Sequence, residues 1–503
     1  MMNFNPSIKL MTSIPKEIIL VANKLVASGY SVYLVGGCVR DLILSQKDLS
    51  RAEPKDWDIA TDAKPDEIQK IFPDNVYENN FGTVGVKTNS KNPTLKIIEI
   101  TTFRLEGKYS DKRHPDEIKF AKTIEEDLSR RDFTINALAL SLAEGMAREI
   151  IDPFGGQEDI KNKIIRTVGN PEERFNEDAL RLMRAVRFAA ELDFKIDNKT
   201  GDAIKKSAGL IEMIAKERIR DELQKILTAR NAAKGIEALE EFGLLKYIVP
   251  ELREGIRVGQ NKHHIYTVWE HNLRALDYCA SKNYSPEVRT ASLFHDVGKP
   301  RTKRGDGPDS TFYGHDIVGA KMVLKILDRL HFSRQFIERT AHLVRYHLFY
   351  YNVGEVTASG VRRFISRVGA ENIGDLIKVR EADRIGSGVP KAVPYKLRHL
   401  LFMIDKVKRD PVSPKMLKVT GNDVMRILKI IPGPRIGWTL SILLNEVIEN
   451  PKENIKKNLE LRIKNLGELS DKKLIKMAEE AKGKKDEFES GIEEEIKKKY
   501  YVK

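Results

Sequence analysis

The sequence predicts an α+β protein in which a small mixed sheet with helices precedes several all-helical domains. Short β-branched and aromatic runs at 31–35, 82–87 and 95–101 are typical of strands, and all lie in the first third of the chain. After about residue 166, apolar residues recur mainly at helical spacing, as in 175–190. With 503 residues, the chain is long enough for several domains.

The composition favours a polyanionic partner inside the cell. The chain has 87 Lys and Arg against 73 Asp and Glu, a net charge of +14. No apolar run approaches the roughly 20 residues of a membrane span, and the N-terminus lacks a signal-peptide pattern. Only Cys38 and Cys279 are present, so a disulfide framework is excluded and a reducing compartment is expected. We therefore expect a soluble, cytoplasmic protein that has no membrane partner.

A glycine-rich turn follows the predicted strand at 31–35. Gly36 and Gly37 allow a tight turn in which no Cβ atom keeps the backbone away from a ligand. Apolar residues recur at helical spacing from Val39 onward, and peptide N–H groups at such a helix start bind phosphate well. Arg40 adds a forked donor within the first turn. This segment is therefore predicted to bind phosphate.

Two carboxylates, Asp56 and Asp58, follow shortly after the glycine turn. In a strand they would project from one face roughly 6.6 Å apart, and their repulsion would be relieved by a hard divalent cation. An isolated Asp-x-Asp is more often a solvated turn, but here it follows a phosphate-binding turn within a plausible β-α-β segment. Glu99 is either an edge-strand charge that prevents aggregation or a third carboxylate of the same site. Phosphate donors beside metal carboxylates favour nucleotidyl transfer.

Residues 125–138 are expected to enter a helix. Arg131 can pair with phosphate, and Asp132 and Asn136 would share a face one turn apart. From spacing alone, a salt bridge and a helix cap explain this pair equally well. The preceding segment 107–115 is polar and basic, contains glycine and ends in proline, so a mobile loop is expected there.

These motifs resemble those of the class II tRNA nucleotidyltransferases and bacterial poly(A) polymerases. The matching segments are Val35–Asp41, Asp56–Asp58, Glu99–Thr102 and Arg130–Asn136. The resemblance implies a polymerase-β-like head that uses CTP or ATP and two Mg²⁺ ions. It implies that Asp56, Asp58 and Glu99 are the catalytic carboxylates and that the two aspartates bind Mg²⁺. The nucleotide-binding residues that it implies are Gly36, Gly37, Arg40 and Arg131, with Asp132 and Asn136 near the sugar.

A polar stripe runs along the long helix predicted at 175–190. Its members recur at intervals of three residues: Asp178, Arg181, Arg184 and Arg187. Such a stripe is usually a solvated face. However, an Asp–Arg pair offers an acceptor and a donor that match cytosine and adenine but clash with uracil and guanine, and bidentate contacts of this kind discriminate by about 1–3 kcal/mol. The family carries the same Glu-Asp-x-x-Arg motif, which implies that Asp178 and Arg181 read the base while Arg184 and Arg187 assist binding.

Histidines gather in the middle of the chain. The pair His295–Asp296 ends an apolar helix and lies between His271 and Asp383 on two further helices, so it is not a lone core histidine. Nitrogen and carboxylate ligands of this set suit a transition metal. The region resembles the HD phosphohydrolase superfamily, which implies that these four residues are ligands. It also implies second-site or substrate roles for His315, His342 and His347. Whether this domain hydrolyses a phosphoester is left open by the sequence.

We therefore divide the chain into four predicted domains: a nucleotidyltransferase head (1–165), a helical neck that binds base and RNA (166–250), an HD metal-binding domain (251–400) and a tRNA-binding tail (401–503). The predicted function is addition of CCA to the tRNA 3′ end from CTP and ATP. In the family, enzymes that add only the two C residues lack much of the 107–115 loop, which this chain retains. The alternatives are a poly(A) polymerase, an A-adding tRNA nucleotidyltransferase, or an HD phosphohydrolase whose head tethers RNA.

Overall fold

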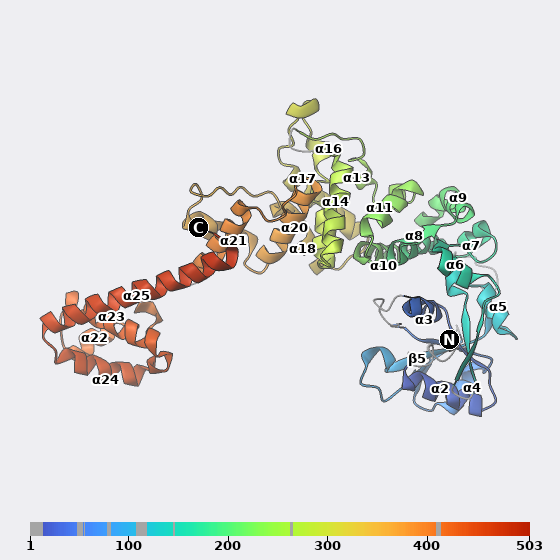
Figure 1. Ribbon diagram of the computed structural model, residues 1–503, viewed down its shortest axis with the longest axis horizontal. Coiled ribbons are helices and arrows are strands. Elements are labelled where there is room, and N and C mark those ends of the chain that lie inside the picture. Colours follow the sequence, from blue (N-terminus) through green and yellow to red (C-terminus); the bar gives the residue numbers. More distant parts are fainter. Residues whose placement is uncertain are drawn as a thin grey trace, which may run out of the picture. The chain divides into compact units, whose positions relative to one another are not determined.

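The described part of the chain forms two compact units (Figure 1). The computed structural model describes residues 14–47, 54, 56–77, 82–106, 118–143, 146–261, 265–408 and 414–502. The predicted loop at 107–115 lies outside these residues. The first unit contains the described residues up to 348 together with 375–390, and the second contains 349–374 and the described residues from 391 onward. The division into four domains stays a prediction.

A seven-stranded mixed sheet forms the centre of the N-terminal part of the first unit. Its strands are β1 (Val32–Val35), β2 (Asp58–Thr61), β3 (Asn75–Tyr77), β4 (Thr83–Lys87), β5 (Ile97–Thr102), β8 (Ala139–Ala143) and β9 (Met146–Ile151). Their order in the sheet is β3-β4-β5-β2-β1-β8-β9. The pair β2–β5 is parallel and the other neighbouring pairs are antiparallel. This sheet and the helical remainder confirm the predicted α+β class.

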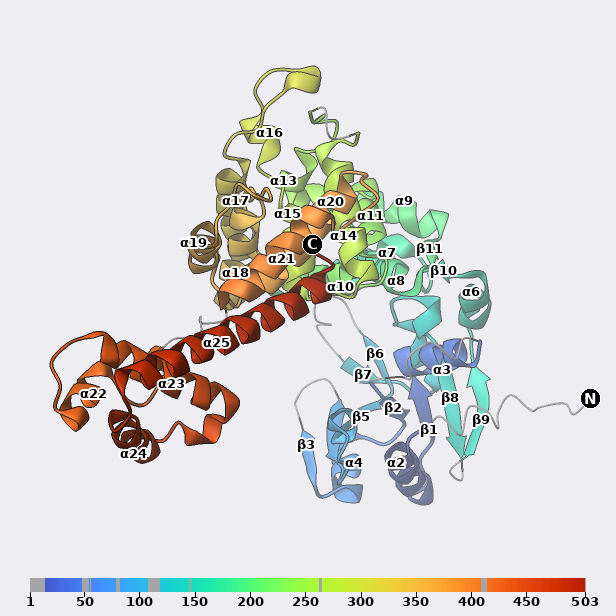
Figure 2. The same ribbon diagram turned by 60° about the vertical axis from the view of Figure 1, so that its left-hand side comes forward.

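Alternation along the strands separates a buried face from a polar one. Ile59 and Ile100 are fully buried, while Asp58 is half-buried and Glu99 is exposed. The helices α2 (Lys16–Ala27) and α4 (Pro65–Ile71) pack against the strands, α2 on β1 and β8 and α4 on β3, β4 and β5 (Figure 2). The polar face is thereby left open at the start of β2.

The predicted helix across 125–138 is wrong in its extent. The helix α5 (Ile124–Ser129) ends early, and Phe133 takes an extended backbone (φ −130°, ψ 149°) that bridges to Thr167. A 3₁₀ turn, η3 (Thr134–Asn136), follows. The other short elements nearby are η2 (Pro93–Leu95), β6 (Arg104–Glu106), which pairs with β7 (Ile118–Phe120), α6 (Gly156–Asn162), and β10 (Ile164–Ile165), which pairs with β11 (Lys195–Ile196).

The predicted helix at 175–190 is also interrupted. The helix α7 (Pro171–Glu177) ends at Asp178, whose extended backbone (φ −134°, ψ 106°) breaks the helical path. The Asp178 carboxylate accepts a 3.0 Å hydrogen bond from Leu180 N, and α8 (Leu180–Leu192) begins there. The remaining helices of this region are α3 (Gly37–Lys47), which follows β1, and α9 (Asn198–Ser207), η4 (Ala208–Met213), α10 (Lys216–Thr228), α11 (Ala232–Glu241), α12 (Leu245–Ile248) and α13 (Pro250–Arg253).

A helical bundle completes the first unit. Its elements are α14 (Val268–Ser281), α15 (Pro286–Phe294), α16 (Lys299–Thr302), η5 (Gly307–Asp309), α17 (His315–Arg329), α18 (Arg334–Tyr346) and most of α20 (Ile373–Gly386). The pairs α14–α15, α17–α18 and α15–α18 pack together, and α10 and α11 pack on α15 and α14. The bundle and the neck helices thus share one continuous core.

The second unit is helical. Its elements are α19 (Ala358–Val368), α21 (Tyr395–Lys408), η6 (Pro414–Met416), α22 (Gly421–Leu428), α23 (Pro434–Glu449), η7 (Pro451–Glu453), α24 (Lys456–Gly467) and α25 (Asp471–Tyr500). Its largest buried cluster includes Leu443, Ile463 and Leu474. Among the helices that the structure describes, none has both the length and the apolar character of a membrane span.

Candidate active site and metal centre

A cavity of about 1110 Å³ opens beside the sheet and the neck helix α8. Most of the residues that the sequence singled out line it: Gly36, Gly37, Arg40, Asp56, Asp58, Arg131, Asp132, Asn136, Arg184 and Arg187. Three other described residues, Glu99, Asp178 and Arg181, do not line it. The cavity therefore joins the glycine turn, the aspartate pair and two of the neck arginines in one site.

Two features require a glycine at position 36: the conformation of its backbone and a side chain that lies close to it. Its φ of +79° lies in the left-handed region, which residues with a Cβ rarely adopt. A Cβ atom at this position would lie 2.6 Å from Nη1 of Arg131. Since Gly36 N also donates to Leu138 O at 3.1 Å, the turn is fixed in place while Arg131 lies directly against it.

The carboxylates gather at the start of β2. Asp58 is its first residue and lies in register with Glu99 of the parallel strand β5, so the two residues face the same side of the sheet. Asp56 precedes the strand and is exposed, which differs from the predicted position within a strand. Burial raises the pKa of Asp58, Arg131 opposes this rise, and Asp56 adds to it. Carboxylate oxygens gathered in this way fit a hard divalent cation.

Asp127 holds the arginines of this region, and the sequence analysis missed it. Its Oδ1 accepts from Arg130 Nη2 at 2.9 Å, and its Oδ2 lies 3.4 Å from Arg131 Nη2. Burial alone would raise the pKa of Asp127, but the two guanidinium groups lower it. The i,i+3 and i,i+4 spacing of these three residues was the available signal.

A hydrogen-bonded chain joins Arg40 of the head to Arg184 of the neck. Arg40 Nη1 donates to Asn136 Oδ1 at 2.7 Å, and Asn136 Nδ2 donates to Asp132 Oδ1 at 3.2 Å. Arg184 donates from Nε and Nη2 to the other oxygen of Asp132, at 2.8 and 2.5 Å. Burial would raise the pKa of Asp132, but Arg184 and Arg181 lower it to about 2. Asp132 is therefore ionised at neutral pH and orients Arg184.

Phe188 lies among three guanidinium groups. The Cζ atoms of Arg187, Arg40 and Arg184 lie 4.1, 5.2 and 5.4 Å from its ring centroid. The side chain is only 5% exposed, and Phe133 meets its ring edge-on at 5.7 Å. The ring thus lies between like charges and attracts each of them. Sequence analysis missed this residue because a phenylalanine beside an apolar helix stripe reads as ordinary core.

The other three polar residues of the neck stripe each bind a partner of their own. Arg187 Nη1 donates to the buried Glu222 at 3.0 Å. Asp178 binds Arg218, with 2.8 Å between Oδ2 and Nη2, whereas Arg181 binds Glu177 at 2.6 Å. The structure therefore does not join the side chains of Asp178 and Arg181 to each other, and their role as base readers stays a prediction.

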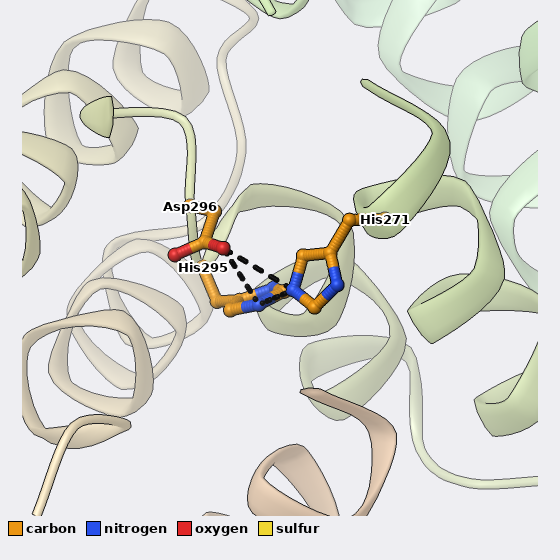
Figure 3. A group of neighbouring side chains, drawn as sticks. All are labelled: His271, His295 and Asp296. Carbon is orange, nitrogen blue, oxygen red and sulfur yellow. Dashed lines mark hydrogen bonds and ion pairs between the residues drawn. The ribbon is translucent and has the colours of Figure 1, made fainter. Parts of the chain in front are cut away.

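A second site lies in the helical bundle, where four predicted ligands meet: His271, His295 and Asp296, which Figure 3 shows, and Asp383. His271 Nε2 lies 2.8 Å from His295 Nε2, 3.2 Å from Asp296 Oδ2 and 3.4 Å from Asp383 Oδ1. All four side chains are buried. Helices α14 and α20 provide His271 and Asp383, while His295 and Asp296 follow α15 directly.

The other carboxylate oxygen of Asp296 faces a second histidine pair. His315 Nε2 lies 3.3 Å and His347 Nε2 lies 3.7 Å from Asp296 Oδ1. Asp296 therefore belongs to two groups that are each compact enough to hold an ion. His342, the third histidine considered, packs on the ring of Tyr346 and belongs to neither group.

The histidine tautomers suit metal binding. The Nδ1 atoms of His295, His315 and His347 lie 2.8, 2.8 and 2.7 Å from backbone carbonyl oxygens, so each Nδ1 carries the proton. Their Nε2 lone pairs then converge on Asp296. Burial and the neighbouring His295 lower the pKa of His347 to about 3, which keeps this ring neutral. Imidazole nitrogens around a carboxylate fit a divalent transition metal.

Comparison with known families covers three parts of the chain. Residues 32–166 match the model of the Poly A polymerase head domain. Residues 193–256 match that of a probable RNA and SrmB-binding site of polymerase A, and residues 268–386 match the HD domain.

Similar proteins extend this comparison. The chain is 34% identical to the CCA-adding enzyme of Geobacillus sp. over 86% of this chain and 92% of that protein. It is 37% identical to the A-adding tRNA nucleotidyltransferase of Deinococcus radiodurans over 65% of this chain and 76% of that protein. The crystal structure of the Bacillus stearothermophilus CCA-adding enzyme in complex with CTP is similar, with a TM-score of 0.56 and 29% identity over 89% of this chain and 96% of that one.

Replacing Phe188 should show whether its ring positions the arginines or only fills space in the core. Each cation–π contact is worth about 0.5–2 kcal/mol, so Phe188→Leu should lower the affinity for CTP, the ligand that the sequence predicts, at least about tenfold in equilibrium binding. Phe242→Leu is the matched control, because Lys205 lies over that ring at 5.6 Å but Phe242 does not line the cavity. Both variants should stay folded by circular dichroism. Equal loss of CTP affinity in the two would contradict a positioning role for Phe188.

Proposed function

The chain belongs to the family of class II tRNA nucleotidyltransferases and poly(A) polymerases, and from this membership we infer that it adds CCA to the 3′ end of tRNA from CTP and ATP. The observation that carries this proposal is the cavity that unites Asp56 and Asp58 with five arginines. The neck and tail are proposed to bind the tRNA, in keeping with the RNA-binding model matched by 193–256. A cytoplasmic location is proposed because both cysteines are free thiols.

Residues that line the cavity or lie outside it have separate proposed roles in nucleotide transfer. Asp56, Asp58 and Glu99 would hold divalent cations, for which we propose Mg²⁺. When bound, these ions activate the RNA 3′-hydroxyl and neutralise the departing pyrophosphate. Arg40 and Arg131 bind triphosphate oxygens beside the glycine turn. Asp132 and Asn136 hold Arg40 and Arg184 in position near the sugar. Asp178 and Arg181 read the base, which requires that they exchange their present partners.

The choice between CCA and A addition rests on the relatives. The CCA-adding relative aligns over more of this chain than the A-adding relative does, although the latter is slightly more identical. The alternative of a tethering head is disfavoured, because the aspartates and the phosphate-binding arginines all meet in one cavity.

The added nucleotides can be determined directly. A tRNA lacking its last three nucleotides is incubated with CTP, with ATP or with both, and the 3′ ends are then sequenced. We expect two C residues with CTP alone and a complete CCA with the mixture. Addition of one A to a tRNA that already ends in CC, without any C addition, would indicate an A-adding enzyme. Long A tails on unrelated RNA would indicate a poly(A) polymerase.

The aspartate pair can be tested with an isosteric change. Asp58→Asn removes a charge that the phosphates and cations require, so incorporation of CTP should fall at least about 100-fold. The affinity for tRNA, measured without nucleotide, should be unchanged. Asp62→Asn is the control, since Asp62 lies just after the same strand and accepts from Ser31 N at 2.8 Å. Near-normal incorporation by Asp58→Asn would reject the assignment.

The helical bundle has a second proposed function, which its His/Asp cluster favours. We propose that Asp296 bridges two transition-metal sites, one with His271, His295 and Asp383 and the other with His315 and His347. When bound, such ions would polarise a phosphoester and activate water. Of the chain's residues, Asp296 would contribute the shared negative charge, and the histidines would contribute imidazole nitrogen donors. We propose hydrolysis of small phosphoesters such as 2′,3′-cyclic phosphates.

The number of metal ions bound per chain tests whether Asp296 serves two sites. After loading with Ni²⁺, which favours imidazole ligands, and desalting, elemental analysis should find two ions per wild-type chain. His347→Gln should retain one, and Asp296→Ala should retain less than one and lose any cyclic phosphate hydrolysis. Nucleotide addition should remain in both variants. Asp316→Asn is the control, because Asp316 adjoins His315 but pairs with Arg345. One ion in both wild type and His347→Gln would rule out the second site.

A further inference from the structure

The cations and carboxylates of the cavity are mostly neutralised in pairs. Among the arginines that line it, Arg40 pairs with Asp41, Arg131 with Asp127, Arg184 with Asp132 and Arg187 with Glu222. Two lining cations are different, because neither Lys163 nor Arg230 has a carboxylate within ion-pair distance among the described residues. Both side chains are exposed. Among the described residues, the cavity thus presents two positive charges that form no direct ion pair.

These two cations lie away from the aspartate pair. Lys163 follows α6, and Arg230 lies between α10 and α11. Both act on Asp193, the residue that ends α8, and help to lower its pKa after the hydrogen bond from Lys234. Asp193 lies nine positions after Arg184, which corresponds to roughly 13 Å along the helix axis. Lys163 and Arg230, which act on Asp193 at the end of α8, are therefore remote from Arg184 and Asp132.

The size of the cavity allows two ligands. At about 1110 Å³ it exceeds the roughly 300–1,000 Å³ of pockets that enclose one drug-sized molecule. Nucleotide transfer needs an incoming triphosphate and an RNA 3′ end in the same cavity. The triphosphate has its partners beside the glycine turn, where Arg40 and Arg131 meet the aspartates. A second anion at Lys163 and Arg230 would thus come from another molecule.

We propose that Lys163 and Arg230 form a phosphate-binding subsite for the backbone of the RNA primer near its 3′ end. This inference rests on the proposed nucleotidyl transfer and adds the position of the second substrate. Two cations on separate elements can contact successive phosphates of a single strand, which fixes its register without reading its bases. The neighbouring carboxylate of Asp193 is bound by Lys234 at 2.8 Å and so repels the strand less.

The test measures the binding of RNA and the use of nucleotide separately. The variants are Lys163→Asn, chosen because asparagine tolerates the positive φ of 57° at this position, Arg230→Gln, and the double variant. Affinity for a tRNA that lacks its last three nucleotides is measured without nucleotide at several salt concentrations. Each substitution should weaken binding several-fold and reduce the slope of log K against log salt by about 0.7. The KM for CTP should be unchanged.

A neighbouring lysine provides the control. Lys161→Asn alters an exposed residue of α6 that pairs with Glu158 at 3.2 Å and does not line the cavity, so its salt slope should equal that of wild type. A raised KM for CTP with normal RNA affinity would assign the subsite to the triphosphate instead. Wild-type affinity and salt slope in the double variant would reject the subsite. Failure of the wild-type protein to incorporate any nucleotide would instead reject the proposed function.

Discussion

The buried carboxylate of Asp132 is the constraint on which the nucleotide cavity depends. Removing a carboxylate from water is costly, and this one is retained in charged form because Arg184 and Asn136 bind its two oxygens. Through Asn136 the same carboxylate also positions Arg40, so one anion orients cations from the head and from the neck. Loss of Arg184 would leave the buried charge of Asp132 without its ion-pair partner, which typically costs about 3–5 kcal/mol. The cavity is therefore preorganised for an anionic ligand.

Asp296 plays a comparable part in the helical bundle, but with both oxygens directed at histidines. Its Oδ2 faces His271 and its Oδ1 faces His315, while Lys299 lies 2.6 Å from Oδ2. Several charged and neutral groups thus compete for one fully buried carboxylate, and its pKa is far below the usual range because Lys299 and the histidines outweigh burial. The two sites of the chain follow the same principle: a buried anion arranges the groups around it.

Local sequence patterns predicted those parts of the site whose structure depends on residues close together in the chain. The glycine turn, the strand that starts at Asp58 and its neighbour that carries Glu99 all follow from alternation and from steric need within a few residues. The breaks at Phe133 and Asp178 were missed, because tertiary partners override helical periodicity there: Phe133 bridges to Thr167, and Asp178 caps α8 and binds Arg218. The position of Phe188 among three arginines depends on Arg40 of α3 reaching over a ring of α8, which no spacing encodes.

The helix α10 contacts residues of both the nucleotide cavity and the helical bundle. Its Glu222 holds Arg187 of the nucleotide cavity, and carbonyl oxygens at its C-terminal end bind a buried arginine of the bundle. That arginine, Arg289 of α15, donates to Leu227 O at 3.2 Å and to Ala229 O at 2.9 Å. The helix α15 leads directly into His295 and Asp296, so the contact of Arg289 with α10 ties the segment that carries these two residues to the neck. The bundle therefore supports the neck through a side chain that is not itself among the proposed metal ligands.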